Sequence, residues 1–342
     1  MKRKTLISLV STLFILAAVA CGPGPAPKAG TASPDDMLAM IPHDVSGLVF
    51  IDMNKAMSTS MAKDAIKKAA AEEDFQQFIE ATGFDLEKDL HYLALGLTGK
   101  LDSKKMEAVA VINMKYDKEK ILDAMKQKAQ EEGEEGEEDK GSLIEKDYEG
   151  MTMYKWEKDE ENNYFVFYDE SNALFGDEAS VMSSIDVILK KKDSVLKNED
   201  LTALIGRTNK DALLWGAILL PQEVMEEATA GNPMVSGLGA IRSVALFFDY
   251  KNANLMADIL LMSDDATKNK QIADSLTGLK GLGGLFAGEN PEIADLIGRI
   301  EITSGDDNVR ISATIPESLI NTITEKEQAK AEEKEKEGEI KE

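Results

Sequence analysis

The sequence predicts an α+β fold with antiparallel or mixed sheets, helices on one face, and two similar halves. Short β-rich runs alternate with amphipathic helical stretches, and the helical stretches follow Asp, Ser or Asn residues, which cap helix N-termini. Neighbouring β-rich runs are close enough in the chain to pair as hairpins, which favours antiparallel pairing. Both halves run strand, helix, hairpin, helix, antiparallel strands, helix. We therefore expect a degenerate duplication.

The first element is a signal peptide, predicted over residues 1–20. The chain starts with Met-Lys-Arg-Lys and continues with an apolar run that ends at Ala20. This run is shorter than the roughly 20 apolar residues that a spanning helix needs. A basic start, a short apolar core and small residues at its end are typical of a secretory signal.

The only cysteine, Cys21, follows this signal directly. The residues Ala18-Val19-Ala20-Cys21 resemble the lipobox of bacterial lipoproteins, and this resemblance implies cleavage before Cys21 and lipidation of its thiol. The alternative is a secreted protein cut after Ala20 with a spare thiol. In that family an Asp directly after the cysteine retains the protein at the inner membrane. In this sequence Gly22 occupies that position. The resemblance thus implies delivery to the outer membrane in a cell that has one.

Residues 21–34 are predicted to be the lipidated cysteine and a flexible tether. Four of the nine prolines (Pro23, Pro25, Pro27, Pro34) lie in this stretch with three glycines, a composition that resists both helix and sheet. Each buried lipid methylene contributes about 0.8 kcal/mol, so the several acyl chains that the resemblance implies would anchor the protein permanently. The membrane is therefore the expected partner of Cys21.

The composition limits the classes of function. The formal charge of −24 becomes −27 when Lys2, Arg3 and Lys4 leave with the signal, because no acid leaves with them. Such a surface repels phosphate backbones, which argues against nucleic-acid binding. With Cys21 lipidated, no thiol remains for a disulfide, a nucleophile or a thiolate metal site. About 320 mature residues can form one large or two ordinary domains.

The first half is predicted to span residues 35–208. Its β-rich runs alternate with capped helical stretches, and an acidic run with seven acids in nine residues is expected to be a solvated loop at 131–139. Strands are predicted at 47–52, 92–97, 107–114, 151–156, 164–169 and 172–177, and helices at about 55–81, 117–128, 178–191 and 198–206.

The second half is predicted to span residues 209–324, followed by a charged tail at 325–342. A hairpin turns around Lys251 and Asn252, and Asp265 lies among the residues expected to open a long helix. The layout resembles uncharacterised secreted and lipid-anchored bacterial proteins, a resemblance that implies no activity. Strands are predicted at 212–220, 243–250, 253–262, 298–304 and 308–315, and helices after Pro221, from 263–265 to about 285, and from Pro316.

Candidate catalytic and metal-binding residues are few. Ser60 and Lys63 have the Ser-x-x-Lys spacing of penicillin-binding enzymes and β-lactamases, but such pairs also arise by chance at this composition. His43 and His91, the two histidines, lack a partner at metal-ligand spacing and are interpreted as structural. Met53, Met57 and Met61 could hold monovalent copper, although the buried face of a helix explains them better.

A glycine-rich stretch, residues 278–288, lacks the full dinucleotide-binding pattern because Phe286 occupies its last position. Leucines at spacing three, ending at Leu282 and Leu285, predict a packing stripe near a helix end. A mobile flap over an apolar cleft is the alternative.

These observations predict a lipid-anchored envelope protein that acts as a non-enzymatic binding or scaffolding module, with another envelope component as its partner. A carrier of an apolar ligand is the first alternative, and a serine hydrolase using Ser60 is the second. We expect no cofactor and no metal.

Overall fold

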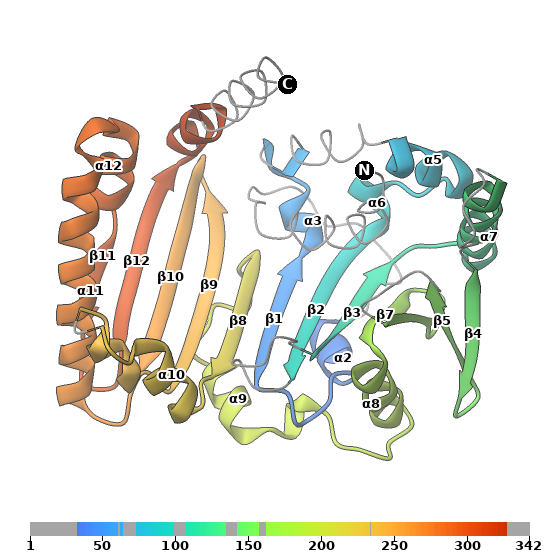
Figure 1. The fold of residues 1–342 in the computed structure, drawn as a ribbon, viewed down its shortest axis with the longest axis horizontal. Coiled ribbons are helices and arrows are strands. Elements are labelled where there is room, and N and C mark those ends of the chain that lie inside the picture. The colour runs from blue at the N-terminus through green and yellow to red at the C-terminus, as the bar shows by residue number, and fades with distance from the viewer. Residues whose placement is uncertain are drawn as a thin grey trace. The chain divides into compact units, whose positions relative to one another are not determined.

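A computed structural model describes residues 33–60, 62–63, 73–98, 107–134, 142–156, 162–232 and 234–326, and it confirms the predicted α+β class (Figure 1). The chain divides into two compact units, one ending at Leu219 and the other starting at Leu220. The predicted signal peptide and Cys21 lie outside the described residues.

The first unit contains an antiparallel sheet in the order β8-β1-β2-β3-β7-β6-β5-β4. The hairpin β2–β3 and the meander β5–β7 connect strands that neighbour each other in sequence, as the sequence predicts. The strands are β8 Leu214–Leu219, β1 Gly47–Asp52, β2 Leu90–Thr98, β3 Glu107–Met114, β7 Asn172–Asp177, β6 Asn163–Phe167, β5 Met151–Trp156 and β4 Leu143–Tyr148.

One face of this sheet holds the core of the first unit. Leu48 and Phe50 of β1 are buried on it, and the Phe50 ring stacks on the Trp215 ring of β8 with centroids 5.2 Å apart. Ile41 and Val45 lie against Gly96 of the same face. Helix α8, Glu178–Ile188, covers the far end of this face, where it contacts β3, β6 and β7. Its Glu178 and Asp186 carboxylates bind Lys146 and Tyr148 of β4.

The helices of the first unit begin at residues that cap them. Asp177 accepts from the Ser180 amide at the start of α8, and Asn198 accepts from the Leu201 amide at the start of α9. Asp117 accepts from the Lys120 amide at the start of α7. The helices are α2 Pro34–Leu38, α3 Met53–Ala56, α5 Glu73–Thr82, α6 Leu86–Asp89, α7 Lys118–Glu134, α8 Glu178–Ile188, η1 Val195–Lys197 and α9 Glu199–Ile205.

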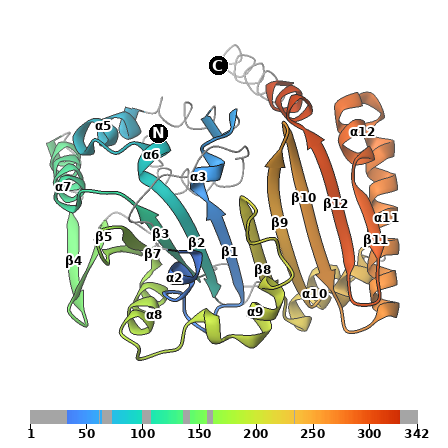
Figure 2. The same cartoon turned by 180° about the vertical axis from the view of Figure 1, so that it is seen from behind.

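The second unit has the strand order β11-β12-β10-β9, with antiparallel neighbours (Figures 1 and 2). Its core lies between one sheet face and the helices, around Leu261, Ile272 and Val309. The chain is helical again at 317–326. The elements are α10 Gln222–Thr229, η2 Ser236–Ala240, β9 Ser243–Lys251, β10 Asn254–Met262, α11 Ala266–Phe286, η3 Ala287–Glu289, α12 Pro291–Gly298, β11 Glu301–Ser304 and β12 Val309–Pro316.

The two units repeat one path of the chain, which agrees with the predicted similar halves. In the first, the hairpin β2–β3 pairs through β3 with β7, and β7 pairs with β6. In the second, the hairpin β9–β10 pairs through β10 with β12, and β12 pairs with β11. A long helix follows the hairpin in both, α7 in one and α11 in the other. The first unit has further strands outside this path, the hairpin β4–β5 and the pair β1–β8.

The boundary between the halves differs from the predicted one at residues 208 and 209. Strand β8, expected to open the second half, pairs with β1 and belongs to the first unit. The reason is burial, since Trp215 and Ala217 of β8 are fully buried in the core of that unit.

Further differences concern element ends. Ser33 caps α2 and Pro34 is its first residue, so the predicted tether at 21–34 ends in ordered backbone. Helix α7 runs through Glu134, and the first residues of the predicted loop at 131–139 are therefore helical, as good helix formers favour. The closing helix starts after Pro316, which still belongs to β12. Strand β4 and helix α12 were not predicted.

Candidate functional site

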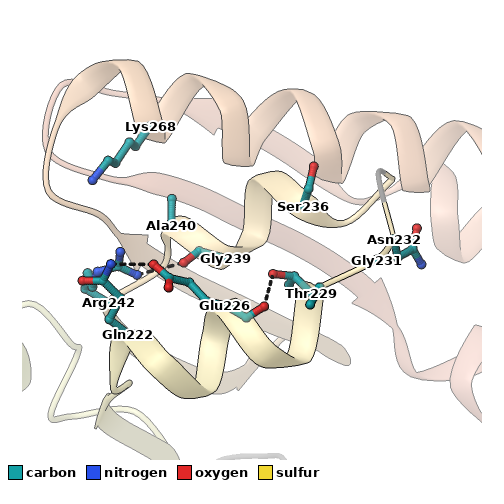
Figure 3. A pocket seen from close by; sticks show the side chains of 11 residues that line it. Gln222, Glu226, Thr229, Gly231, Asn232, Ser236, Gly239, Ala240, Arg242 and Lys268 are labelled. Atoms are coloured by element: carbon teal, nitrogen blue, oxygen red, sulfur yellow. Dashed lines mark hydrogen bonds between the residues drawn. The ribbon is translucent and has the colours of Figure 1, made fainter.

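The candidate site is a pocket of about 580 Å³ in the second unit, open to solvent between α10, η2 and the first turn of α11 (Figure 3). Its lining residues come from three short segments, which lie between positions 222 and 268 of the chain. The side chains that give it its chemistry are Gln222, Glu226, Thr229, Asn232, Ser236, Arg242 and Lys268.

Two glycines of η2 allow this arrangement. A Cβ atom at Gly237 would lie 2.8 Å from the Gln271 carbonyl oxygen of α11, and one at Gly239 would lie 2.7 Å from the Thr229 hydroxyl oxygen of α10. Any side chain at either position would push these segments apart. The sequence Ser-Gly-Leu-Gly-Ala therefore packs η2 tightly between the two helices and fixes the pocket wall.

Arg242 is the most constrained cation of the pocket. Its Nη1 group donates to the carbonyl oxygens of Gly239, at 2.8 Å, and Ile241, at 3.1 Å, and its Nε lies 3.7 Å from an Asp264 carboxylate oxygen. These contacts hold the guanidinium in place while its Nη2 donors have no partner among the described residues.

Lys268 stands across the pocket and forms an ion pair with Asp264 at 2.6 Å. The pKa of Asp264 is lowered, mainly by the hydrogen bond from Lys268. Burial opposes this effect, and the charges of Lys268 and Arg242 lower the pKa further by smaller amounts. Asp264 thus stays ionised and contacts two cations, Arg242 just before β9 and Lys268 in α11. The pair is half exposed, so its effect on stability is small.

The wall formed by α10 supplies an amide, a carboxylate and a hydroxyl. The Gln222 amide donates to the Glu226 carboxylate at 2.5 Å, and the Thr229 hydroxyl lies 3.4 Å from the Glu226 carbonyl oxygen (Figure 3). The same hydroxyl donates to the Met225 carbonyl at 2.8 Å. None of the described lining residues is His or Cys, and the Thr229 proton is already used. The arrangement can donate and accept hydrogen bonds.

The sequence-predicted site residues do not meet at this pocket. Cys21 and the lipobox lie outside the described residues. Ser60 and Lys63 are exposed in the first unit, and no hydrogen bond joins their side chains among the described residues. Nothing described there would activate the Ser60 hydroxyl.

The two histidines are separate from each other and from the pocket. His43 is exposed, and its backbone binds Asp193 and Asn198. The half-buried His91 ring contacts the Asn54 side-chain oxygen at 3.1 Å, and burial lowers the pKa of His91. Met53 and Met57 are buried as core residues, and Met61 lies outside the described residues.

The glycine-rich stretch forms the C-terminal part of α11 and a short 3-10 turn. Leu276 packs on the core of the second unit, in agreement with the predicted stripe, but Leu285 is 78% exposed. The stripe therefore leaves the core before the helix ends. Gly278, Gly281 and Gly284 have open space where a side chain would be, so packing does not require them.

A second cluster, in the first unit, combines a cation with aromatic rings. The Lys118 Nζ lies 5.6 Å from the Tyr154 ring centre and 5.8 Å from that of Phe167. The Tyr154 ring also stacks on Phe165 at 5.2 Å. The rings contact one another, which indicates a packing role.

Two further searches cover only the described part of the chain. Within it, no group of three or more His, Cys, Asp and Glu residues is placed to hold a metal ion. In the same residues, no helix combines the length and apolarity that crossing a bilayer requires.

In comparisons with known proteins, this chain shows only distant similarity to solved structures. No family model matches this chain, and no curated protein does. Among solved structures, crystal form I of TP0453 has a TM-score of 0.44 at 9% identity, covering 86% of this chain and 97% of that one. Crystal form III of TP0453 has a TM-score of 0.45 at 10% identity, covering 86% and 98%. Similarity at this level assigns no residue role.

Sequence reasoning missed the pocket, because its residues come from a short helix, a 3-10 turn, a strand start and a helix start. The available signal was Gly237 and Gly239 just before Arg242, a glycine pair that marks close backbone approach beside a cation.

Proposed function

We propose that this protein is a lipid-anchored component of a bacterial cell envelope that acts as a non-enzymatic binding or scaffolding module. Cys21 carries the lipid, and the folded units bind another envelope component. In a cell with two membranes, the proposed destination is the outer one. The binding role is supported above all by the pocket of the second unit, where hydrogen-bonding groups stand on a frame fixed by glycine packing.

The charges around the pocket suggest its ligand. Arg242 and Lys268 are balanced by Asp264 and Glu226, so the formal charge of this group is zero. A polyanion would gain little there. Amide donors, hydroxyls and the remaining guanidinium donors suit a neutral or zwitterionic ligand rich in hydrogen-bonding groups, and the volume matches a molecule of ordinary ligand size.

Native mass spectrometry of the chain purified from envelopes tests this pocket. We expect a bound polar molecule on the wild type and its loss in Ala230→Trp, because Ala230 lines the pocket and an indole there would fill it. Ala228→Trp is the matched control, since Ala228 is exposed on the same helix and does not line the pocket. Equal retention of the molecule by both variants would remove the pocket from the proposal.

A carrier of an apolar ligand is the second candidate. The sheet of the first unit favours it, because Val49 and Leu95 face each other across β1 and β2 and both are only half buried. Ile112 of β3 lies on the same face, also half buried. In the same mass spectrum a bound lipid that Ala230→Trp retains would favour this candidate.

A further inference from the structure

We propose that the free edge of β4 is a docking site for an extended polypeptide segment with basic residues at alternate positions, which adds a strand to the sheet of the first unit. This surface is separate from the pocket, which lies in the other unit, and it does not depend on the role of that pocket.

Strand β4 is the last strand in its sheet order and pairs only with β5. In Figures 1 and 2 no described segment of the first unit lies beyond it. An antiparallel edge strand of this kind presents unpaired main-chain N–H and C=O groups to which another chain can bind.

The turn of the β4–β5 hairpin defines which groups are free. Glu149 and Gly150 form a two-residue connection, with φ values of 53° and 81°. Two positive φ values are typical of a type I′ turn, in which the flanking residues, Tyr148 and Met151, form a hydrogen-bonded pair. Bonding then alternates along β4, so the main-chain groups of Leu143, Glu145 and Asp147 point away from β5. Among the described residues, nothing bonds to them.

The edge is held in place from its other side. The Lys146 ammonium binds the Glu178 carboxylate of α8, and the Tyr148 hydroxyl donates to the Asp186 carboxylate at 3.1 Å. Lys191, which follows α8, pairs with Glu149 in the hairpin turn. These contacts order the strand before a partner arrives, which lowers the entropic cost of pairing.

Charge selects the partner. Glu145 and Asp147 are exposed, lie on one face two residues apart, and have no ion-pair partner among the described residues. A neighbouring strand places its side chains about 5 Å from those opposite, so Lys or Arg at alternate positions would pair with both acids. The partner residue between the two basic ones lies opposite Lys146, whose ammonium already pairs with Glu178. The next partner residue on that face lies opposite Ile144, which is 38% exposed and suits an apolar side chain.

The same charges disfavour a second copy of this chain. Two copies could pair their β4 edges antiparallel through the outward residues Leu143, Glu145 and Asp147. If all three residues pair, Glu145 lies opposite Glu145 of the copy. If one strand is shifted by two residues, Glu145 lies opposite Asp147 of the copy. Like charges directly opposite each other destabilise a strand pair, so the edge selects a different, basic chain.

The test uses the full chain and three labelled peptides in fluorescence anisotropy. The first is Thr-Lys-Val-Lys-Val-Lys-Thr, the second has the same composition with its three lysines contiguous, and the third has Glu in place of Lys. We expect the alternating basic peptide to bind at least tenfold more tightly than the others. Hydrogen exchange should slow in residues 142–148 when it is bound.

The double variant Glu145→Lys, Asp147→Lys should lose binding of the alternating basic peptide by tenfold or more and gain binding of the acidic one. Glu170→Lys is the matched control, with the same charge change at an exposed acid outside β4, and it should bind like the wild type. Equal binding of both basic peptides, unchanged binding by the double variant, unaltered exchange in 142–148, or no binding at all would each overturn the proposal.

Discussion

At the scale of single residues, the two faces of β1 have different roles. Leu48 is fully buried among core side chains, whereas its neighbour Val49 points to the opposite, half-buried face. Strand periodicity predicts that side chains alternate between two faces, but it does not predict which face is more buried, because both faces carry apolar residues. Leu213, which precedes β8, is buried, whereas Val49 is only half buried.

Leu48→Asp should therefore lower the free energy of unfolding by more than about 4 kcal/mol, because it leaves an unpaired charge in the core. Val49→Asp should cost about 1–2 kcal/mol, since water reaches its face. Urea denaturation of both variants checks this pair. Equal losses would mean that both faces of β1 are closed to water.

Tyr116 provides a titration test in the same unit. Its hydroxyl donates to the Asp169 and Asn172 carbonyl oxygens. Burial, with a further contribution from the Asp169 charge, raises the pKa of Tyr116 to about 12. Because the folded pKa lies above the unfolded one, this tyrosine favours folding below about pH 10 and loses that effect as pH rises towards 12. In an absorbance titration at 295 nm, Tyr116→Phe should remove a tyrosine that ionises near pH 12; removal of one ionising near pH 10 would contradict this.

At the scale of elements, the strands and helices with clear periodicity or caps were predictable. Strands β1, β3, β5 and β7 have the predicted bounds, because each is rich in apolar or aromatic residues, which alternate with Thr and Lys in part of β5. Strand β4 was missed, since an edge strand carries charges in place of a buried face. Helix α12 carried a signal, with Asn290 as its cap and Pro291 in its first turn. The pocket could not be predicted, because tertiary packing brings its segments together.

Two glycines of the second unit have different effects on stability: Gly237 permits close packing, whereas Gly281 only lowers the helix propensity of α11. Gly237→Ala places a methyl group against the Gln271 backbone and should destabilise the protein by about 1–3 kcal/mol. Gly281→Ala, within α11 where a side chain meets open space, should stabilise it by up to about 1 kcal/mol. Thermal unfolding of both variants measures the two signs. A neutral Gly237→Ala would mean that η2 can move away from α11, and the pocket wall would not be rigid.

At the scale of the whole molecule, a fold of two similar units follows a segment that is predicted to direct the protein to the cell envelope. Both units repeat one strand path, and each offers a different surface: a polar pocket in the second and a charged sheet edge in the first. Such an arrangement suits a protein that holds partners, and attachment to a membrane would keep those partners at the envelope.

Metabolic labelling with a radioactive fatty acid tests the central claim, membrane attachment through Cys21, most directly. The wild type should incorporate the label and sediment with membranes. Cys21→Ser should incorporate none, while its folded units keep the unfolding temperature of the wild type, because the contacts described for both units are made by residues from Ser33 onwards. Undiminished labelling of Cys21→Ser, or a wild type without label, would contradict the account.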